Sequence, residues 1–237
     1  MNKYILVDIV TEKLAADLGM TAKPLPKEIK VMKTVLPSGK VRFESTLYQT
    51  KKLKRVTISK RNLGGNIAGT VLMMVSASEY DIPFTLVDIA FDSAEKRISA
   101  AFQIRLLLND TKSTTEYVKP FASWLEKLLQ LPSKPMSPFG EPGEFIKANP
   151  PELKYQRTLS DNYTDEVLKL TRQFFDIYRQ VYKNAEPVTD AKRRSEMNAF
   201  RSAYNEHILG DDPSGKMLIK TFGQRTAALF YDYLVYL

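Results

Sequence analysis

Residues 66–75 read NIAGTVLMMV, an almost unbroken apolar run that predicts a strand at the centre of a sheet. Further short segments rich in Val, Ile, Leu and Phe lie on both sides of it, at residues 28–36, 41–49, 54–60, 83–91 and 97–107. Turn-forming residues separate these segments at 37–39, 62–66 and 92–95. Connections this short leave no room for a crossover helix, so neighbouring strands should be antiparallel. The pattern predicts a meander of about six strands.

The remainder of the chain has mostly helical periodicity. Apolar stripes predict helices within residues 2–19, 116–130, 163–183, 189–208 and 214–236. Residues 131–152 contain six prolines and predict an irregular excursion. Strands in one block followed by helices are typical of an α/β sandwich with an antiparallel sheet rather than of a Rossmann fold. We expect residues 1–237 to form a single domain.

The composition excludes several kinds of site. The chain has no cysteine, which rules out disulfides, thiolate metal sites and a cysteine nucleophile within it. Its single histidine, His207, rules out any site that needs two imidazoles. The net charge of +8 favours an anionic partner or ligand, without distinguishing nucleic acid, membrane, small molecule and acidic protein. Because no apolar run is long enough for a membrane span and no signal-peptide pattern opens the chain, we expect a cytoplasmic protein with no membrane partner.

Residues 210–217 (GDDPSGKM) nearly match the phosphate-binding loop of nucleotide-binding proteins. The match fails because Met217 has no hydroxyl for magnesium and because two aspartates would lie against the phosphates. No strand pattern precedes the motif either, so we do not expect nucleotide binding.

The densest basic stretch consists of Lys51, Lys52, Lys54, Arg55, Lys60 and Arg61, which we call the basic cluster. Its simplest interpretation is a solvated edge face. The functional interpretations are contact with nucleic-acid phosphates, a docking patch for a partner, or one arginine turned inward to hold a carboxylate. No helix-turn-helix, RRM or zinc-finger pattern accompanies the cluster, so we expect no nucleic-acid partner.

Asp88 is the most informative single residue. It interrupts a strand otherwise suited to burial, and strand alternation places it on the face of Leu86 and Ala90. A carboxylate there must be paired, hydrogen-bonded or kept protonated by desolvation. It is therefore either a structural hydrogen-bonding group or a proton donor with a raised pKa facing a ligand pocket.

A second acidic candidate, Asp212, precedes Pro213 and has the pattern of a helix N-cap with proline at the first helical position. The lone His207 lies on the preceding predicted helix, where a structural role is the simpler interpretation.

Several stretches together resemble the ferredoxin-dependent bilin reductases. They are residues 47–55 (LYQTKKLKR), residues 78–88 (SEYDIPFTLVD), residues 98–101 (ISAA), residues 178–182 (YRQVY) and the C-terminal series Asp212-Pro213, Leu218, Phe222-Gly223 and Tyr233-Leu234. The second stretch is similar to the family pattern E-Y-D-x-P-x-F-G-x-D. The resemblance covers roughly residues 45–105 and 157–237.

The resemblance implies a three-layer α/β/α sandwich with a central antiparallel sheet that holds a linear tetrapyrrole between the sheet and the C-terminal helices. It implies no bound cofactor and no metal, because electrons arrive singly from reduced ferredoxin, an acidic partner protein. A basic chain suits both that partner and a substrate with two propionates.

The resemblance also assigns roles by position. Asp88 and Asp212 match the two catalytic aspartates that supply protons to the bilin. Arg55, Ser99 and Arg157 match residues that bind the propionates.

The sequence departs from the phycocyanobilin-forming branch at two pocket positions. Where that branch has a glutamate and a histidine, this chain has Ser59 and Val71, neither of which can replace them as a proton donor or relay. The glycine that precedes the first aspartate in the family is Leu86 here.

We therefore expect a soluble monomeric enzyme that reduces biliverdin or a dihydrobiliverdin to phycoerythrobilin or 15,16-dihydrobiliverdin. The alternatives are a relative that binds a bilin without reducing it and a basic nucleic-acid-binding protein.

Overall fold

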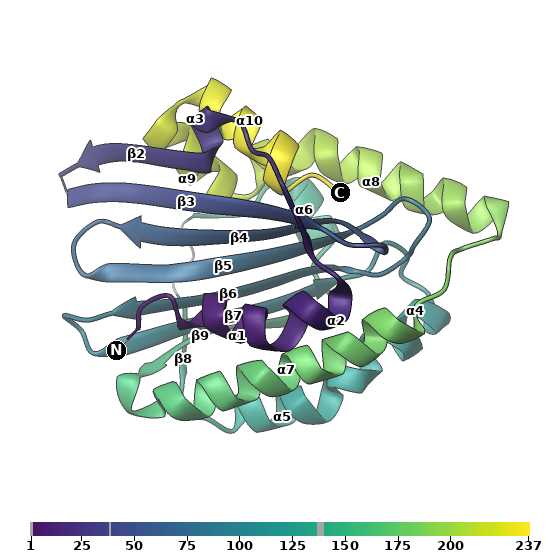
Figure 1. Ribbon diagram of the computed structural model, residues 1–237, viewed down its shortest axis with the longest axis horizontal. Helices are drawn as coiled ribbons and strands as arrows, with labels where there is room; N and C mark the ends of the chain where they lie inside the picture. The colour runs from purple at the N-terminus through teal and green to yellow at the C-terminus, as the bar shows by residue number, and fades with distance from the viewer. Residues whose placement is uncertain (1, 38, 137–139) are drawn as a thin grey trace.

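The computed structural model describes residues 2–37, 39–136 and 140–237, which form a nine-stranded sheet with antiparallel pairing throughout (Figure 1). The strands are β1 (Thr21–Lys23), β2 (Val31–Leu36), β3 (Gly39–Gln49), β4 (Leu53–Leu63), β5 (Ile67–Ser76), β6 (Phe84–Asp92), β7 (Arg97–Arg105), β8 (Lys134–Pro135) and β9 (Leu153–Ser160). Their order is β1-β3-β4-β5-β6-β7-β9-β8, and β2 also pairs with β3. The predicted meander is confirmed as β2–β7.

Helices lie on both faces of this sheet. They are α1 (Ile5–Val10), α2 (Ala16–Leu18), α3 (Lys27–Lys30), α4 (Thr111–Tyr117), α5 (Ala122–Leu129), α6 (Glu144–Ala148), α7 (Thr164–Asn184), α8 (Ala191–Asp211), α9 (Pro213–Phe222) and α10 (Gln224–Leu234). A π-helical turn (Thr11–Ala15) joins α1 to α2, and short 3-10 turns (Lys119–Phe121 and Asp161–Tyr163) precede α5 and α7. The three-layer α/β/α sandwich is confirmed.

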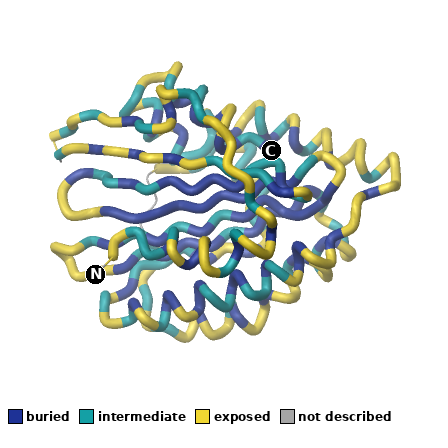
Figure 2. Tube along the Cα trace, in the orientation of Figure 1, coloured by how far each residue is buried: buried dark blue, intermediate teal, exposed yellow. Residues whose placement is uncertain are grey.

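Two separate apolar cores hold the layers together. On the α7 side of the sheet, Phe102 of β7 packs with Trp124 of α5 and Phe174 of α7, and residues of α1 join the same core. On the α10 side, residues such as Phe43 and Phe230 pack under α8, α9 and α10. Because both faces of the central strands are covered, β5 is buried from Ala68 to Ser76, which explains its unbroken apolar run (Figure 2).

The structure differs from the sequence prediction in several segments. β1 was not predicted, and α3 occupies the beginning of the predicted strand 28–36. β9 was not predicted, and the proline-rich excursion contains β8 and α6 as well as residues 137–139, which lie outside the described residues. Ser38, in the predicted 37–39 turn, also lies outside them. The predicted helix 214–236 is divided at Gly223, whose φ of 85° breaks the helical backbone and starts α10 in a new direction. None of the described helices combines the length and apolarity that a membrane crossing needs.

Candidate active site

The candidate site lies on the sheet face that points to α8–α10. Strand register places Ser45, Ser59, Val71, Asp88 and Ala101 side by side in one row across β3 to β7. Because side chains alternate along a strand, the residues of this row face the α10 side, and the residues next to them in the chain face the α7-side core. Asp88 therefore faces the helices formed by the C-terminal part of the chain, as the sequence predicts.

Asp88 is paired with a cation from two strands away. The Arg61 guanidinium on β4 reaches over β5 and forms an ion pair with the Asp88 carboxylate on β6. The Asp88 side chain is 21% exposed and that of Arg61 is 11% exposed. Burial raises the pKa of Asp88 above the ordinary value of a carboxyl group, and the charge and hydrogen bond of Arg61 oppose this rise.

This side of the sheet is partly accessible beside Asp88. Leu86, Asp88 and Ala90 of β6 are half-buried, whereas Val87 and Ile89, which point to the α7 side, are fully buried. On β7 and β9 the residues on the same face, Ser99, Gln103, Gln156 and Thr158, are also half-buried. An incompletely covered sheet face with a carboxyl group on it suits binding of a ligand between sheet and helices.

Asp212 lies in the helical layer, at the junction of α8 and α9. Its Oδ1 accepts a 3.2 Å hydrogen bond from the Ser214 amide, so the predicted N-cap is confirmed. Its Oδ2 accepts a 2.8 Å hydrogen bond from the Tyr231 hydroxyl on α10. Burial raises the pKa of Asp212, while the hydrogen bonds and the charge of Arg105 oppose the rise.

Three groups around Asp212 were missed by the sequence analysis. Arg105, at the end of β7, places its guanidinium 5.5 Å from the Tyr204 ring and donates to the Asn149 carbonyl. Tyr204 and Tyr231 are both buried, and burial raises the pKa of each hydroxyl. A cation that ends an apolar strand was the available signal for Arg105, while the tyrosines resembled ordinary core aromatics.

The glycine of the phosphate-loop motif has a packing role here. A Cβ at Gly215 would lie 2.3 Å from the Leu209 carbonyl oxygen and 2.9 Å from the Tyr231 hydroxyl. The missing side chain therefore lets α10 bring Tyr231 to Asp212. His207 stacks on Phe145 with ring centroids 5.1 Å apart, in accord with its structural interpretation.

Arg55 and Ser99, predicted to bind the substrate, share the α10 side of the sheet with Asp88. Arg55 donates a 2.8 Å hydrogen bond to the Tyr236 carbonyl, and burial lowers the pKa of its guanidinium. Ser99 lies across from Ala90 and contacts Thr158, with 3.2 Å between the two hydroxyl oxygens. Asp88, Arg55 and Ser99 thus share one face of the sheet. Ser99 lies in the row next to Asp88, and Arg55 lies two rows away from Asp88 in the other direction.

Arg157 is not brought together with them. It lies across from Ala100, a fully buried residue of the α7-side core, and so belongs to the opposite face of the sheet. Residue parity on β9 decides this: Gln156 and Thr158 face the Asp88 side, and Arg157 between them does not. This position does not support propionate binding by Arg157 beside Asp88.

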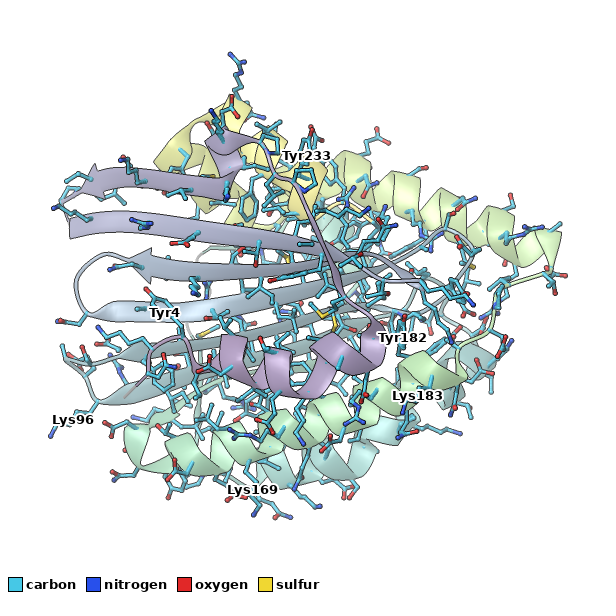
Figure 3. All side chains as sticks on the ribbon, viewed as in Figure 1. Tyr4, Lys96, Lys169, Tyr182, Lys183 and Tyr233 are labelled. Atoms are coloured by element: carbon cyan, nitrogen blue, oxygen red, sulfur yellow. The ribbon has the colours of Figure 1, made fainter. Side chains whose placement is uncertain are left out.

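Most side chains of the basic cluster contact other residues of the chain. Lys52 Nζ lies 2.9, 2.9 and 2.7 Å from the carbonyl oxygens of Tyr182, Lys183 and Ala185 at the end of α7, a corner labelled in Figure 3. Lys60 Nζ lies 5.8 Å from the centroid of the Tyr4 ring. Arg61 holds Asp88, which confirms the interpretation of an arginine turned inward.

Among the described residues, no group of three or more Asp, Glu and His side chains is placed to hold a metal ion. The polar groups described above are carboxyl groups, tyrosine hydroxyls and guanidinium groups, arranged between an antiparallel sheet and a helical layer. This arrangement defines an α/β/α protein suited to proton transfer to a bound ligand.

Comparison with known proteins identifies the family. The sequence model of the ferredoxin-dependent bilin reductases matches residues 7–235. The chain therefore belongs to the ferredoxin-dependent bilin reductase family and is a bilin oxidoreductase, as its sequence motifs indicate.

A solved structure shares the fold. The crystal structure of phytochromobilin synthase from tomato, in complex with biliverdin, is similar with a TM-score of 0.70 and 12% sequence identity, over 95% of this chain and 79% of that one. At this identity the similarity concerns the fold. No curated protein matches the sequence.

Proposed function

We propose that this chain reduces biliverdin or a dihydrobiliverdin, bound between the sheet and α8–α10, with single electrons from reduced ferredoxin. The observation that carries the proposal is the partly accessible sheet face on which Asp88 lies opposite the helical layer that contains Asp212. Burial raises the pKa of both carboxyl groups, as a proton donor at neutral pH requires.

The proposed reaction needs a source for each electron and each proton. Reduction of one double bond takes two electrons, one from each of two reduced ferredoxins, and two protons. Asp88 supplies protons from the sheet and Asp212 supplies them from the helices, and each carboxylate is reprotonated from solvent. Arg55 and Ser99 bind the propionates of the substrate from the same sheet face.

The row that contains Asp88 supports a narrower choice of product. Ser59 and Val71, its neighbours on β4 and β5, provide no acidic or imidazole group. With Asp88 and Asp212 as the carboxyl donors, the favoured products are 15,16-dihydrobiliverdin and phycoerythrobilin.

The test is anaerobic addition of biliverdin to the purified protein, followed by reduced ferredoxin, with the visible spectrum recorded throughout. A shifted spectrum on mixing and stepwise conversion to a product absorbing at shorter wavelength are expected, with chromatography to identify the product. Asp88→Asn should bind biliverdin with a shifted spectrum and lose most of the turnover. Unchanged turnover in this variant would remove Asp88 from the mechanism.

The ion pair with Arg61 favours one alternative, a bilin-binding protein that does not reduce its ligand, because an ionised Asp88 has no proton to donate. Binding of biliverdin without turnover in the same experiment would establish this alternative. Absence of any spectral shift would exclude both functions.

A further inference from the structure

The contact between Arg61 and Asp88 is a strong interaction in the site to which the proposed proton transfers assign no role. Arg61 lies on β4 opposite Gly69 of β5, and Asp88 lies on β6 in the adjacent row. The guanidinium therefore spans a whole strand to reach the carboxylate.

Gly69 is the residue of β5 that lies beside Arg61 at this crossing. It lies between Arg61 and Ala90 in their shared row, and it has no side chain to fill the space under the guanidinium. A Cβ at this position would lie 2.2 Å from the Ile89 carbonyl oxygen, so the two strands approach too closely there for any other residue. Glycine is therefore required here by the close approach of β5 and β6, and it leaves no side chain between Arg61 and Ala90 in this row.

The charged surroundings of Asp88 are simple among the described residues. In its own row it is flanked by Val71 on β5 and Ala101 on β7, which carry no charge. From the helical layer, Asp212 and Tyr231 lie on the same side of the sheet, with Arg105 at the end of β7 beside them. Arg61 is the group whose charge acts on Asp88 through direct contact.

We propose that Arg61 is a positioning residue that fixes the Asp88 carboxyl group and sets its acidity for proton delivery to the bilin. The proposal rests on the proposed function, in which Asp88 is a proton donor.

Two opposing effects make this assignment chemically sensible. Burial raises the pKa of Asp88 and favours the protonated donor, whereas the guanidinium stabilises the carboxylate left after the proton has gone. When an electron from reduced ferredoxin enters the bilin, the O–H bond of Asp88 breaks and the proton bonds to the bilin. The resulting carboxylate is held by Arg61 until solvent returns a proton. A pKa between these two limits serves a general acid best.

Arg61 also has an N–H donor that its contact with Asp88 does not use. Its Nε is buried and has no hydrogen-bond partner among the described residues. A polar oxygen of the substrate can take this donor, so the guanidinium can hold Asp88 and meet a ligand at once.

The test compares Arg61→Met and Arg61→Lys with wild type and with Arg42→Met. Arg42 is a matched control because it forms a 3.1 Å ion pair with Glu44 on the neighbouring β3, with both side chains exposed. In protein labelled with ¹³C at aspartate carboxyl carbons, NMR titration without ligand reports the Asp88 pKa directly, with Asp88→Asn to assign the signal. The second measurement is the pH dependence of the reduction rate.

In Arg61→Met the Asp88 signal should titrate about one pH unit or more higher than in wild type. The limb on which the reduction rate falls with rising pH should move upward by the same amount, while the plateau rate decreases because Asp88 has become a weaker acid. Arg61→Lys should lie between the two, and Arg42→Met should match wild type.

An unmoved Asp88 titration in Arg61→Met and Arg61→Lys would overturn the proposal, even if both variants lost activity through instability. If Arg61→Met does not fold, Arg61→Lys alone decides the question. The double variant Arg61→Met with Asp88→Asn should fold, because it leaves no unpaired buried charge. Failure of the wild-type protein to reduce either biliverdin or a dihydrobiliverdin would reject the proposed function instead, whatever the NMR titration shows.

Discussion

The Tyr231 hydroxyl lies 2.8 Å from Asp212 Oδ2, so a single carboxyl group joins the beginning of α9 to the side of α10. The other carboxyl oxygen, Oδ1, accepts a hydrogen bond from the Ser214 amide, as the oxygen of an N-cap residue does. Capping is therefore compatible with the proposed proton donation by Asp212, because its two oxygens have different partners. Substitutions can separate these two roles.

Asp212→Asn should keep most of the stability and lose most of the reductase activity. Asparagine is as good an N-cap as aspartate, and its amide oxygen can still accept one hydrogen bond, but it cannot supply a proton. Asp212→Ala should lose activity and, in addition, about 1 kcal/mol of the free energy of unfolding, because the cap is gone. Urea unfolding and single-turnover kinetics of both variants would measure these effects. Equal activity in wild type and Asp212→Asn would assign Asp212 to capping alone.

Lys52→Met should destabilise the protein by about 2 kcal/mol. Lys52 Nζ donates to three carbonyl groups at the end of α7, where the helix leaves backbone acceptors unpaired. Hydrogen exchange should show faster opening of the last turn of α7. The control is Lys51→Met, since Lys51 is exposed and should change the stability by no more than about 0.5 kcal/mol. Equal stabilities of the two variants would assign Lys52 to the solvated surface.

Lys54 predicts a pH dependence of stability. Burial, with the charges of Arg55 and Arg201, lowers the pKa of Lys54 from 10.5 to about 8. The unfolded chain therefore binds this proton more strongly than the folded protein, so the charged lysine opposes folding fully below pH 8 and less and less as the pH rises toward 10.5.

Lys54→Met should accordingly be more stable than wild type at pH 7, with a difference that shrinks above pH 8. Urea unfolding of both proteins at a series of pH values would measure it, with Lys51→Met as the reference for a solvated lysine. A difference independent of pH would show that the charge of Lys54 is not the cause. Lys54 lies within the irregularity of the β4–β5 register between Leu53 and Arg55, so the variant should also weaken bilin binding if Arg55 beside it meets the propionates.

Gly69→Ala should destabilise the protein by about 3 kcal/mol, since its new methyl group would overlap the backbone of β6. Gly210→Ala is the matched control. Nothing lies within 4 Å of a Cβ at Gly210, which is exposed near the end of α8, and the change should raise stability by about 0.5 kcal/mol. Thermal unfolding of both variants measures the contrast. A well-folded Gly69→Ala protein with wild-type stability would mean that β5 and β6 can separate at this point.

The strands β2–β7 were predictable because each is a local apolar run ended by a turn, and each pairs with its neighbour in sequence. β9 has the same alternation in Leu153, Tyr155 and Leu159, but its partner β7 ends at Arg105, long before it in the chain. No local turn signal indicates a pairing over such a distance, and the prolines before β9 favoured the prediction of irregular structure.

The site divides in the same way. Asp88 was recognisable because a carboxylate in an apolar strand needs a partner. Its partner Arg61 could be placed only once the register of β4, β5 and β6 was known. The face on which Arg157 lies could not be predicted for a related reason, because it depends on strand parity and its strand had not been predicted.

The two-sided sheet has an evolutionary consequence. Ile58 and Leu72 belong to the α7-side core, while the adjoining Ser59 and Val71 point to the site. Residues next to each other in the sequence are therefore under different selection. A mutation that introduces or removes a reactive group at positions 59 or 71 leaves the opposite core unchanged. If these positions set the regiochemistry as proposed, single substitutions there can change the product while the α7-side core stays under separate selection.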